Sequence, residues 1–333
     1  MVLLFAARMA ADRLSGPRLT VFEGLAALPA GERFLDGAAT PIDVGEGNRE
    51  AAYLGMRPDQ GQLAPGPLMV SALRADPPER STHFHLALLS VDDNGQVHET
   101  EGELEPGVLD RLRTRSLVPI PGYGKQHGLV WENVGSLRTV AARETVGRSL
   151  RESLPEGDPE RALRRLIDDS TNLLTESEAN RRLRDEGKAP ANLLWPWGAG
   201  IRLPVPNLAL ERLTPARVSS RSWRLAGLSR LAGYRPAAWH RPDPDADKAD
   251  LRVIRLPEDP EEALYEIHRW RKQTEPSHHA IVLTDGRQAI GLRTDLPSNG
   301  DPFDERLLEE DRSYPGLWTW MSEAWASMGN PDD

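Results

Sequence analysis

The order of apolar and polar positions predicts a chain that mixes strands with helices. Residues 2–7 form a short apolar run, which is typical of a strand buried on both faces. Residues 14–66 are rich in glycine and proline, and one helix is expected around 21–28. Apolar and polar residues alternate over 82–90, and "DDNG" follows as a turn signal, so 82–98 is predicted to form a hairpin.

The middle of the chain predicts helices around a further group of strands. A helix is expected over 106–116 and two strands over 117–134. Asp158-Pro159 suits the start of one long helix, since Asp can cap it and Pro fits its first turn. Gly187 suits its carboxyl end. The apolar face of this helix would consist of Leu163, Leu166, Ile167, Leu173 and Leu174.

From residue 217 onward the pattern changes to alternating helices and strands. Alternation at the chain ends, with hairpins between them, indicates an α/β core split by an inserted α+β domain. In this part the helices are expected over 220–233, 259–273 and 313–329, and the strands over 250–257 and 278–286, after an earlier strand over 192–200.

Composition and charge narrow the class of protein. The chain has 333 residues, 39% hydrophobic and 28% charged, which fits one large or two ordinary globular domains. Its net charge of -10 disfavours a nucleic-acid partner. The sequence contains no cysteine, which excludes disulfide bonds, metal sites built on thiolates and cysteine nucleophiles. The opening "MVLLFAARMA" lacks a basic leader, and no apolar run reaches the roughly 18 residues of a membrane span, so we expect a soluble, cytoplasmic protein.

One segment carries a family resemblance. Residues 178–200 read "EANRRLRDEGKAPANLLWPWGAG", and weaker matching blocks such as "YLGMRP", "GKQHGLVW" and "VGRSLRESLPEG" occur in the family's order. The chain resembles cofactor-independent phosphoglycerate mutases of the archaeal type, in the alkaline phosphatase superfamily. The resemblance implies an alkaline-phosphatase-like core with a mostly parallel sheet, made from 1–73 and 205–333. An inserted domain would occupy 74–204.

The same resemblance implies a phosphoserine intermediate and two divalent metals (Mn, Mg or Zn). The family's first metal ligand ends its first strand in an Asp-Gly-Met pattern, and the corresponding place here is interpreted as Ala7-Arg8. The place of the serine nucleophile is taken by Glu46, and later metal ligands are replaced by Gly286 and Asp295. We therefore expect that the two-metal site and the nucleophile are lost.

The ligand-binding residues that the resemblance implies for the inserted domain differ less from the family pattern than the metal ligands do. His85 stands where the family has an arginine, while His127 is retained. Arg181, Lys188 and Asn192 also remain. These five residues are the candidates for binding a phosphorylated small molecule. The alternative for Lys188 and Asn192 is structural, as a Gly-Lys turn and an asparagine that caps the join between domains.

His83 and His85 raise a separate question. They lie two residues apart, so they would share one face of a strand and could bind zinc if a third ligand approached. His98 or the nearby acids are the candidates for that ligand. The favoured alternative is a solvated face of the sheet.

Two functions remain open. The first is a non-catalytic homologue that binds a phosphorylated metabolite or a protein partner, with Arg8 and Glu46 paired where the metals would bind. The second is an active mutase, converting 3-phosphoglycerate to 2-phosphoglycerate, or a related phosphatase with relocated ligands.

Overall fold

The computed structural model divides the chain into two compact units. The first unit comprises Met1–Gln62 and Val205–Asp333, and the second comprises Leu63–Pro204. The second unit is thus inserted in the first, although its first boundary precedes the expected residue 74. The structure describes residues 18–24, 38–43, 48–57, 60, 63–76, 78, 80–132, 137–157, 160–212, 216–273, 279–284, 288–293 and 315–328.

A mostly parallel sheet forms the centre of the first unit. It has seven strands in the order β11-β10-β12-β1-β13-β14-β2. The strands from β11 to β13 pair in parallel, and β14 and β2 add an antiparallel edge. The expected α/β core with a mostly parallel sheet is therefore confirmed. The strands are β1 (Arg18–Glu23), β2 (Ala38–Asp43), β10 (Arg217–Ser219), β11 (Arg235–Pro236), β12 (Leu251–Arg255), β13 (His279–Thr284) and β14 (Gln288–Arg293).

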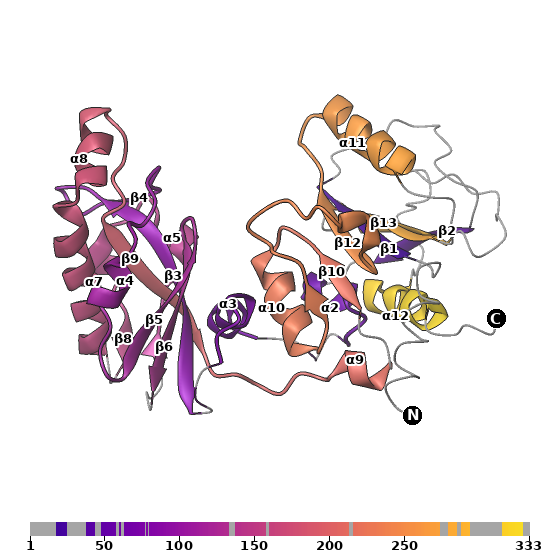
Figure 1. Ribbon diagram of the computed structural model, residues 1–333, viewed down its shortest axis with the longest axis horizontal. Coiled ribbons are helices and arrows are strands. Elements are labelled where there is room, and N and C mark those ends of the chain that lie inside the picture. Colours follow the sequence, from indigo (N-terminus) through magenta and orange to yellow (C-terminus); the bar gives the residue numbers. More distant parts are fainter. Residues whose placement is uncertain are drawn as a thin grey trace. The chain divides into compact units, whose positions relative to one another are not determined.

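Helices cover both faces of this sheet (Figure 1). On one face, Trp270 of α11 packs edge-on against Phe22 at 5.3 Å. The other face carries α2, α10 and α12, and the indole of Trp325 in α12 donates a hydrogen bond to the carbonyl of Tyr53. The helices are α2 (Arg49–Tyr53), α9 (Leu208–Glu211), α10 (Trp223–Leu231), α11 (Pro260–Gln273) and α12 (Leu317–Met328), with a 3-10 turn η2 (Ala246–Lys248).

The second unit is built on an antiparallel sheet. β3 pairs with β9 on one side and β6 on the other, and β6 pairs with β5. Prolines interrupt both outer strands, Pro196 in β9 and Pro119 in β5, and a proline offers no N–H to another chain. The strands are β3 (Ser81–Val91), β4 (Val97–His98), β5 (Leu117–Tyr123), β6 (Gln126–Glu132), β7 (Leu137–Arg138), β8 (Glu156–Gly157) and β9 (Leu193–Gly200).

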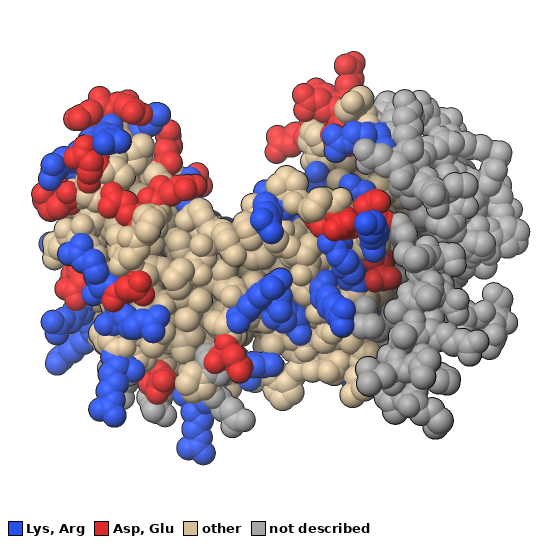
Figure 2. Space-filling view, in the orientation of Figure 1, with Lys and Arg blue, Asp and Glu red and all other residues tan. Residues whose placement is uncertain are grey.

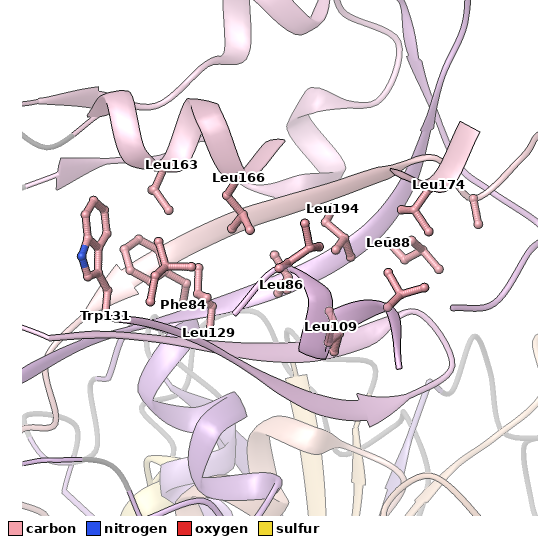
Figure 3. Packing of buried hydrophobic residues seen from close by; sticks show 14 residues of the cluster. Phe84, Leu86, Leu88, Leu109, Leu129, Trp131, Leu163, Leu166, Leu174 and Leu194 are labelled. Carbon is pink, nitrogen blue, oxygen red and sulfur yellow. The ribbon is translucent and has the colours of Figure 1, made fainter. Parts of the chain in front are cut away.

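The largest core of this unit lies between the sheet and α7. Figure 3 shows Leu163 and Leu166 of α7 pointing toward Phe84, Leu86 and Trp131 of the sheet. The leucine periodicity of the helix therefore predicted its buried face correctly. The helices of the unit are α3 (Pro65–Ala72), α4 (Val108–Arg111), α5 (Ala142–Thr145), α6 (Leu150–Ser153), α7 (Glu160–Thr175) and α8 (Glu178–Asp185).

Helix α3 packs on the sheet face opposite to α7 (Figure 1). Gly66 permits this contact, because a Cβ there would lie 2.1 Å from the carbonyl oxygen of His83. Leu73 and Val70 approach Gly128 of β6 from the same side. This packing places α3 in the second unit and explains why the boundary lies at residue 63.

Three local predictions are wrong. The helix expected around 21–28 is not formed at its start, because Val21 and Phe22 are buried in β1. The helix expected over 106–116 is reduced to α4. The long helix from residue 158 is broken, since the Ser177 side chain accepts a hydrogen bond from the N–H of Asn180 and starts α8 as a new helix.

In the described part of the chain, no helix is long and apolar enough to cross a membrane.

Candidate functional site

The carboxyl ends of the parallel strands hold a row of three polar residues. Glu23 of β1 is in register with Arg255 of β12 on one side and with Thr284 of β13 on the other. Neighbours in parallel register present their side chains to the same face of a sheet. In open α/β sheets, ligands bind outside the carboxyl ends of the strands. This edge is therefore the candidate site of the first unit.

Tyr53 binds the acid at the centre of this row. Its hydroxyl donates a 2.8 Å hydrogen bond to Oε1 of Glu23, and its ring is fully buried. Helix α2 positions it, starting at Asn48, whose side chain accepts a hydrogen bond from the N–H of Ala51. Burial, and then the negative charge of Glu23, raise the pKa of Tyr53 well above its usual value. The phenol therefore stays neutral and donates to Glu23 throughout the physiological range.

The turn after α2 is fixed by side chains distant in sequence. Arg212 donates to the carbonyl of Leu54 at 2.8 Å and to that of Gly55 at 3.0 Å. Its guanidinium also lies 5.3 Å from the ring centroid of Trp325 in α12. Gly55 has a φ of +68°, and a Cβ there would lie 2.7 Å from Arg212. These contacts hold α2, and with it Tyr53, against the sheet.

The end of β1 changes the interpretation of the metal-ligand pattern. Among the described strands of the parallel sheet, β1 comes first, and it ends in Glu23-Gly24. An acid followed by glycine at this place matches the Asp-Gly-Met pattern better than Ala7-Arg8 does. Ala7 and Arg8 lie outside the described residues. Glu46, Gly286 and Asp295 also lie outside the described residues, and so does the expected pair of Arg8 with Glu46.

The described residues alone do not assemble a group of metal ligands at this edge. A two-metal centre needs several anionic or imidazole ligands around each ion. Within the residues that the structure describes, no group of three or more His, Asp or Glu side chains could hold a metal ion. In the register of the sheet, Glu23 lies between Arg255 and Thr284.

In the second unit, His83 and His85 lie under α3 and are each only 2% exposed. The expected solvated face is therefore wrong for these residues. His85 stacks on Trp197 of β9, with ring centroids 4.8 Å apart. The arginine that the resemblance would place at position 85 is thus replaced by an imidazole packed on an indole.

His83 is held as a neutral ring by a short chain of hydrogen bonds. The Ser81 hydroxyl donates to the carbonyl of Pro78 at 2.5 Å, so it accepts from Nε2 of His83 at 2.9 Å. Nδ1 then carries no proton, and it has no hydrogen-bond partner among the described residues. Burial, and then the charge of Arg202, lower the pKa of His83 to about 4. Ser81 donates away from the ring, so this pair is not arranged as a nucleophile with its base.

His127 does not join His85 in one site. It is opposite Leu86 in the β3–β6 register, whereas His85 is opposite Gly128, so the two rings lie on opposite faces of the sheet. Nδ1 of His127 accepts a 3.0 Å hydrogen bond from the N–H of Gly122. Burial lowers the pKa of His127 to about 4.

Arg181 and Lys188 lie on the surface at α8. Arg181 pairs with Glu178, and Lys188 donates to Glu186 at 2.8 Å, a hydrogen bond that raises the pKa of Lys188. Figure 2 shows basic and acidic side chains interspersed over this end of the second unit. The two cations are therefore neutralised by their neighbours and do not form a separate positive patch.

Asn192 has a backbone partner. Its side chain accepts a 2.8 Å hydrogen bond from the N–H of Val91 and donates a 2.9 Å one to the carbonyl of the same residue. This exchange joins the start of β9 to the end of β3, inside the second unit. Asn180, which the sequence did not single out, acts similarly: it donates to the carbonyls of Leu174 and Ala191. The sequence could have indicated Asn180 because it is a polar residue within residues 178–200, the segment that carries the family resemblance.

Comparison with known proteins gives partial matches in sequence. No family model matches the chain. It is 34% identical over 108 residues to a probable 2,3-bisphosphoglycerate-independent phosphoglycerate mutase of Geobacter sulfurreducens, covering 32% of this chain and 27% of that protein. It is 24% identical over 190 residues to the corresponding mutase of Methanothrix thermoacetophila, covering 55% of this chain and 48% of that protein. The matches thus span less than half of each relative.

The fold comparison covers nearly the whole chain. A cofactor-independent phosphoglycerate mutase from Thermoplasma acidophilum has a TM-score of 0.61 at 14% identity, over 95% of this chain and 100% of that one. The PH0037 protein from Pyrococcus horikoshii has a TM-score of 0.63 at 12% identity, over 96% and 99%. The chain is therefore a homologue of proteins named as cofactor-independent phosphoglycerate mutases, and it has the alkaline-phosphatase-like fold of their solved structures.

Proposed function

We propose that this chain is a non-catalytic homologue of phosphoglycerate mutases that binds a phosphorylated small molecule. The observation that carries the proposal is the row at the carboxyl edge of the parallel sheet. Arg255 stands in register beside Glu23, and Tyr53 donates to the same carboxylate. The carboxylate of Glu23 therefore already accepts a hydrogen bond from Tyr53, and Arg255 is its cationic neighbour in the sheet.

The chemistry of phosphoryl transfer explains why this arrangement opposes catalysis. The reaction depends on dications that neutralise the phosphate oxygens and activate the nucleophile. A guanidinium beside the metal position repels a dication, while it attracts a phosphate. The family resemblance supports the same proposal, because it would place Glu46 at the serine nucleophile and Gly286 and Asp295 at later metal ligands.

An active metal-dependent enzyme is the second candidate. The observation that favours it is Glu23-Gly24 at the end of β1, since a carboxylate there could serve as the first metal ligand. Its reaction would be the conversion of 3-phosphoglycerate to 2-phosphoglycerate, or a related phosphatase reaction.

The proposal also includes the kind of partner that the chain binds and its location in the cell. A protein partner is a further candidate for such a homologue. A nucleic-acid partner is disfavoured by the net charge of -10. The cysteine-free composition fits the cytoplasm.

Metal content and turnover separate the two candidates. The full chain would be incubated with Mn²⁺, Co²⁺ and Zn²⁺, freed of loose metal, and measured for bound metal by native mass spectrometry. We expect near-zero metal and no turnover of 3-phosphoglycerate. One or two tightly bound ions that are lost in Glu23→Gln, together with turnover, would establish the second candidate instead.

Calorimetry tests the binding half of the proposal. The probes are 3-phosphoglycerate, 2-phosphoglycerate and inorganic phosphate, titrated without metal. We expect binding that Arg255→Ala weakens and that Arg235→Ala, an exposed arginine on β11, leaves unchanged. If none of the three probes binds the unsubstituted chain, the phosphorylated ligand is wrong.

A further inference from the structure

One segment of the first unit carries a large excess of positive charge. Residues 212–241 contain seven arginines and no lysine, aspartate or glutamate. Because the whole chain has a net charge of -10, its other residues together carry -17. A basic segment within an acidic chain concentrates a positive potential on the elements that it forms. These elements are β10, α10 and β11.

Two of the seven arginines serve the fold of the unit. Arg212 donates to the carbonyls of Leu54 and Gly55. Arg217 pairs with Asp243, whose carboxylate is largely buried. The positive charge that is left comes from the five other arginines, which are Arg221, Arg224, Arg230, Arg235 and Arg241.

Three of these five arginines gather at the amino end of α10. Arg221 directly precedes the capping residue Ser222, and Arg224 lies in the first turn of the helix. Nη2 of Arg221 lies 3.5 Å from the carbonyl oxygen of His240. Burial, and then the charges of Arg241 and Arg221, lower the pKa of His240, so both guanidinium groups are within electrostatic reach of that ring. We call Arg221, Arg224 and Arg241 the arginine cluster.

An indole belongs to the same surface. The guanidinium of Arg224 lies 4.9 Å from the ring centroid of Trp223, which is half-buried. On the other side, His240 packs edge-on against Trp239 with ring centroids 5.8 Å apart. Arginine and tryptophan are enriched among the residues that supply most of the binding energy in protein interfaces. The composition of this surface is therefore typical of an interaction site.

No carboxylate among the described residues neutralises the arginine cluster. Its three side chains form no ion pair there, and those of Arg221 and Arg241 are exposed. Figure 2 shows basic side chains on the surface at the place where Figure 1 labels α10. Arginines of other helices pair with an acid of their own helix, as in Arg165–Asp169, Arg182–Glu178 and Arg269–Glu266. The charge of the cluster thus remains available to a partner.

We propose that the arginine cluster, together with Trp223, is a docking surface for an acidic segment of a protein partner. Guanidinium groups bind carboxylates in bidentate pairs, and the indole offers an apolar contact beside them. An extended segment of five residues is about 17 Å long, which exceeds the roughly 10–12 Å diameter of a helix with its side chains. A short acidic segment is therefore sufficient to cover the cluster.

Charge complementarity favours a peptide over a nucleic acid. A strand of phosphates that continued past the cluster would meet a chain whose other residues carry -17. An acidic peptide segment can end where the cluster ends. The proposal needs neither a metal nor a phosphorylated ligand, so it does not rest on the proposed function.

Fluorescence anisotropy with labelled peptides tests the docking surface. The probes are fluorescein-labelled hexaglutamate and hexaglutamine, titrated with the full chain at low ionic strength and without phosphate. We expect only the glutamate peptide to bind, with an affinity that falls as salt is added, because salt screens exposed charges. Arg221→Ala combined with Arg241→Ala should lower this affinity about tenfold, since charge-assisted pairs are lost.

A matched pair of arginines in the second unit provides the control. Arg113 and Arg115 are exposed and form no ion pair among the described residues, so Arg113→Ala combined with Arg115→Ala removes the same charge. This control should leave the affinity unchanged. Arg224→Lys keeps the charge but removes the planar group over the indole, and it should weaken binding less than the paired substitution at Arg221 and Arg241.

Circular dichroism would check that each variant is folded, and the single substitutions decide if the paired one does not fold. A labelled oligothymidylate is the third probe. Three results would overturn the proposal: equal affinity for the two peptides, equal losses in the paired substitution and its control, or tighter binding of the oligothymidylate than of hexaglutamate.

Discussion

The hydroxyl of Tyr53 donates a 2.8 Å hydrogen bond to the carboxylate of Glu23, joining α2 to the carboxyl end of the central strand β1. The two residues are 30 positions apart. Arg212 donates to the carbonyl of Leu54, and Trp325 of α12 donates to that of Tyr53 itself, so the bond is part of a rigid arrangement. Its strength can be measured without knowing any ligand.

Tyr53→Phe should destabilise the first unit by about 1 kcal/mol, since a hydrogen bond to a half-buried carboxylate is lost while the ring is kept. The measurement is urea unfolding of the full chain. Tyr265→Phe, an exposed tyrosine on α11, is the matched control and should change nothing. A double-mutant cycle with Glu23→Ala isolates the coupling, because alanine removes the acceptor, and a coupling of zero would mean that the bond does not form in solution.

Lowering the pH should reduce the free energy of unfolding of the second unit, because its buried histidines bind protons less readily than they do in the unfolded chain. Burial lowers the pKa of His83 and of His127 to about 4. The unfolded chain binds these protons near the ordinary value of about 6.5. The stabilisation from each neutral ring is therefore complete above pH 6.5, and it is lost as the pH falls toward 4, at ~1.4 kcal/mol per unit of pKa difference.

Hydrogen exchange of residues 81–91 across this pH range would detect the loss. His83→Gln and His127→Gln should each flatten the pH dependence. His98→Gln, a change at an exposed histidine on β4, should leave it as it is. A pH dependence that is identical in all four proteins would show that the rings are protonated without cost.

The helices with strong apolar periodicity could be predicted from the sequence, and the site could not. The leucines of α7 and the tryptophans of α12 repeat at helical spacing, so their faces and approximate ends follow from local pattern. β1 has only six residues and lies within the stretch 14–66 that is rich in glycine and proline, so the apolar run at 2–7 is the stronger sequence signal for a first strand. A first strand at 2–7 aligns the metal-ligand pattern with Ala7, whereas β1 as the first described strand aligns it with Glu23.

The burial of His83 and His85 also depends on partners that are distant in the sequence. Alternation along β3 predicts that they share a face, yet it does not say what covers that face. The cover is α3 and Trp197, and Gly66 decides how closely α3 approaches. Such contacts between elements have no local signature in a single sequence.

Gly66→Ala tests this cover directly. The new Cβ would lie 2.1 Å from the carbonyl oxygen of His83 and 2.7 Å from Cα of Phe84, and backbone atoms cannot rotate away. Overpacking of this kind should destabilise the second unit by roughly 1–3 kcal/mol in urea unfolding. Gly316→Ala provides the control, because its surroundings are open. An equally stable Gly66→Ala would mean that α3 is not seated on β3 in this way.

Asn192 and Lys188 belong to the same resembling block, and their substitutions should separate a structural role from a ligand-binding one. Asn192→Ala leaves the backbone N–H and carbonyl of Val91 without partners at the β3–β9 junction, which should cost about 1–3 kcal/mol in urea unfolding. Lys188→Ala removes only an exposed pair with Glu186, so the unfolding midpoint should stay unchanged. Binding of 3-phosphoglycerate by calorimetry completes the test. If Lys188→Ala abolishes binding at unchanged stability, the lysine contacts the ligand; if affinity is kept, the Gly-Lys turn and the asparagine serve the fold.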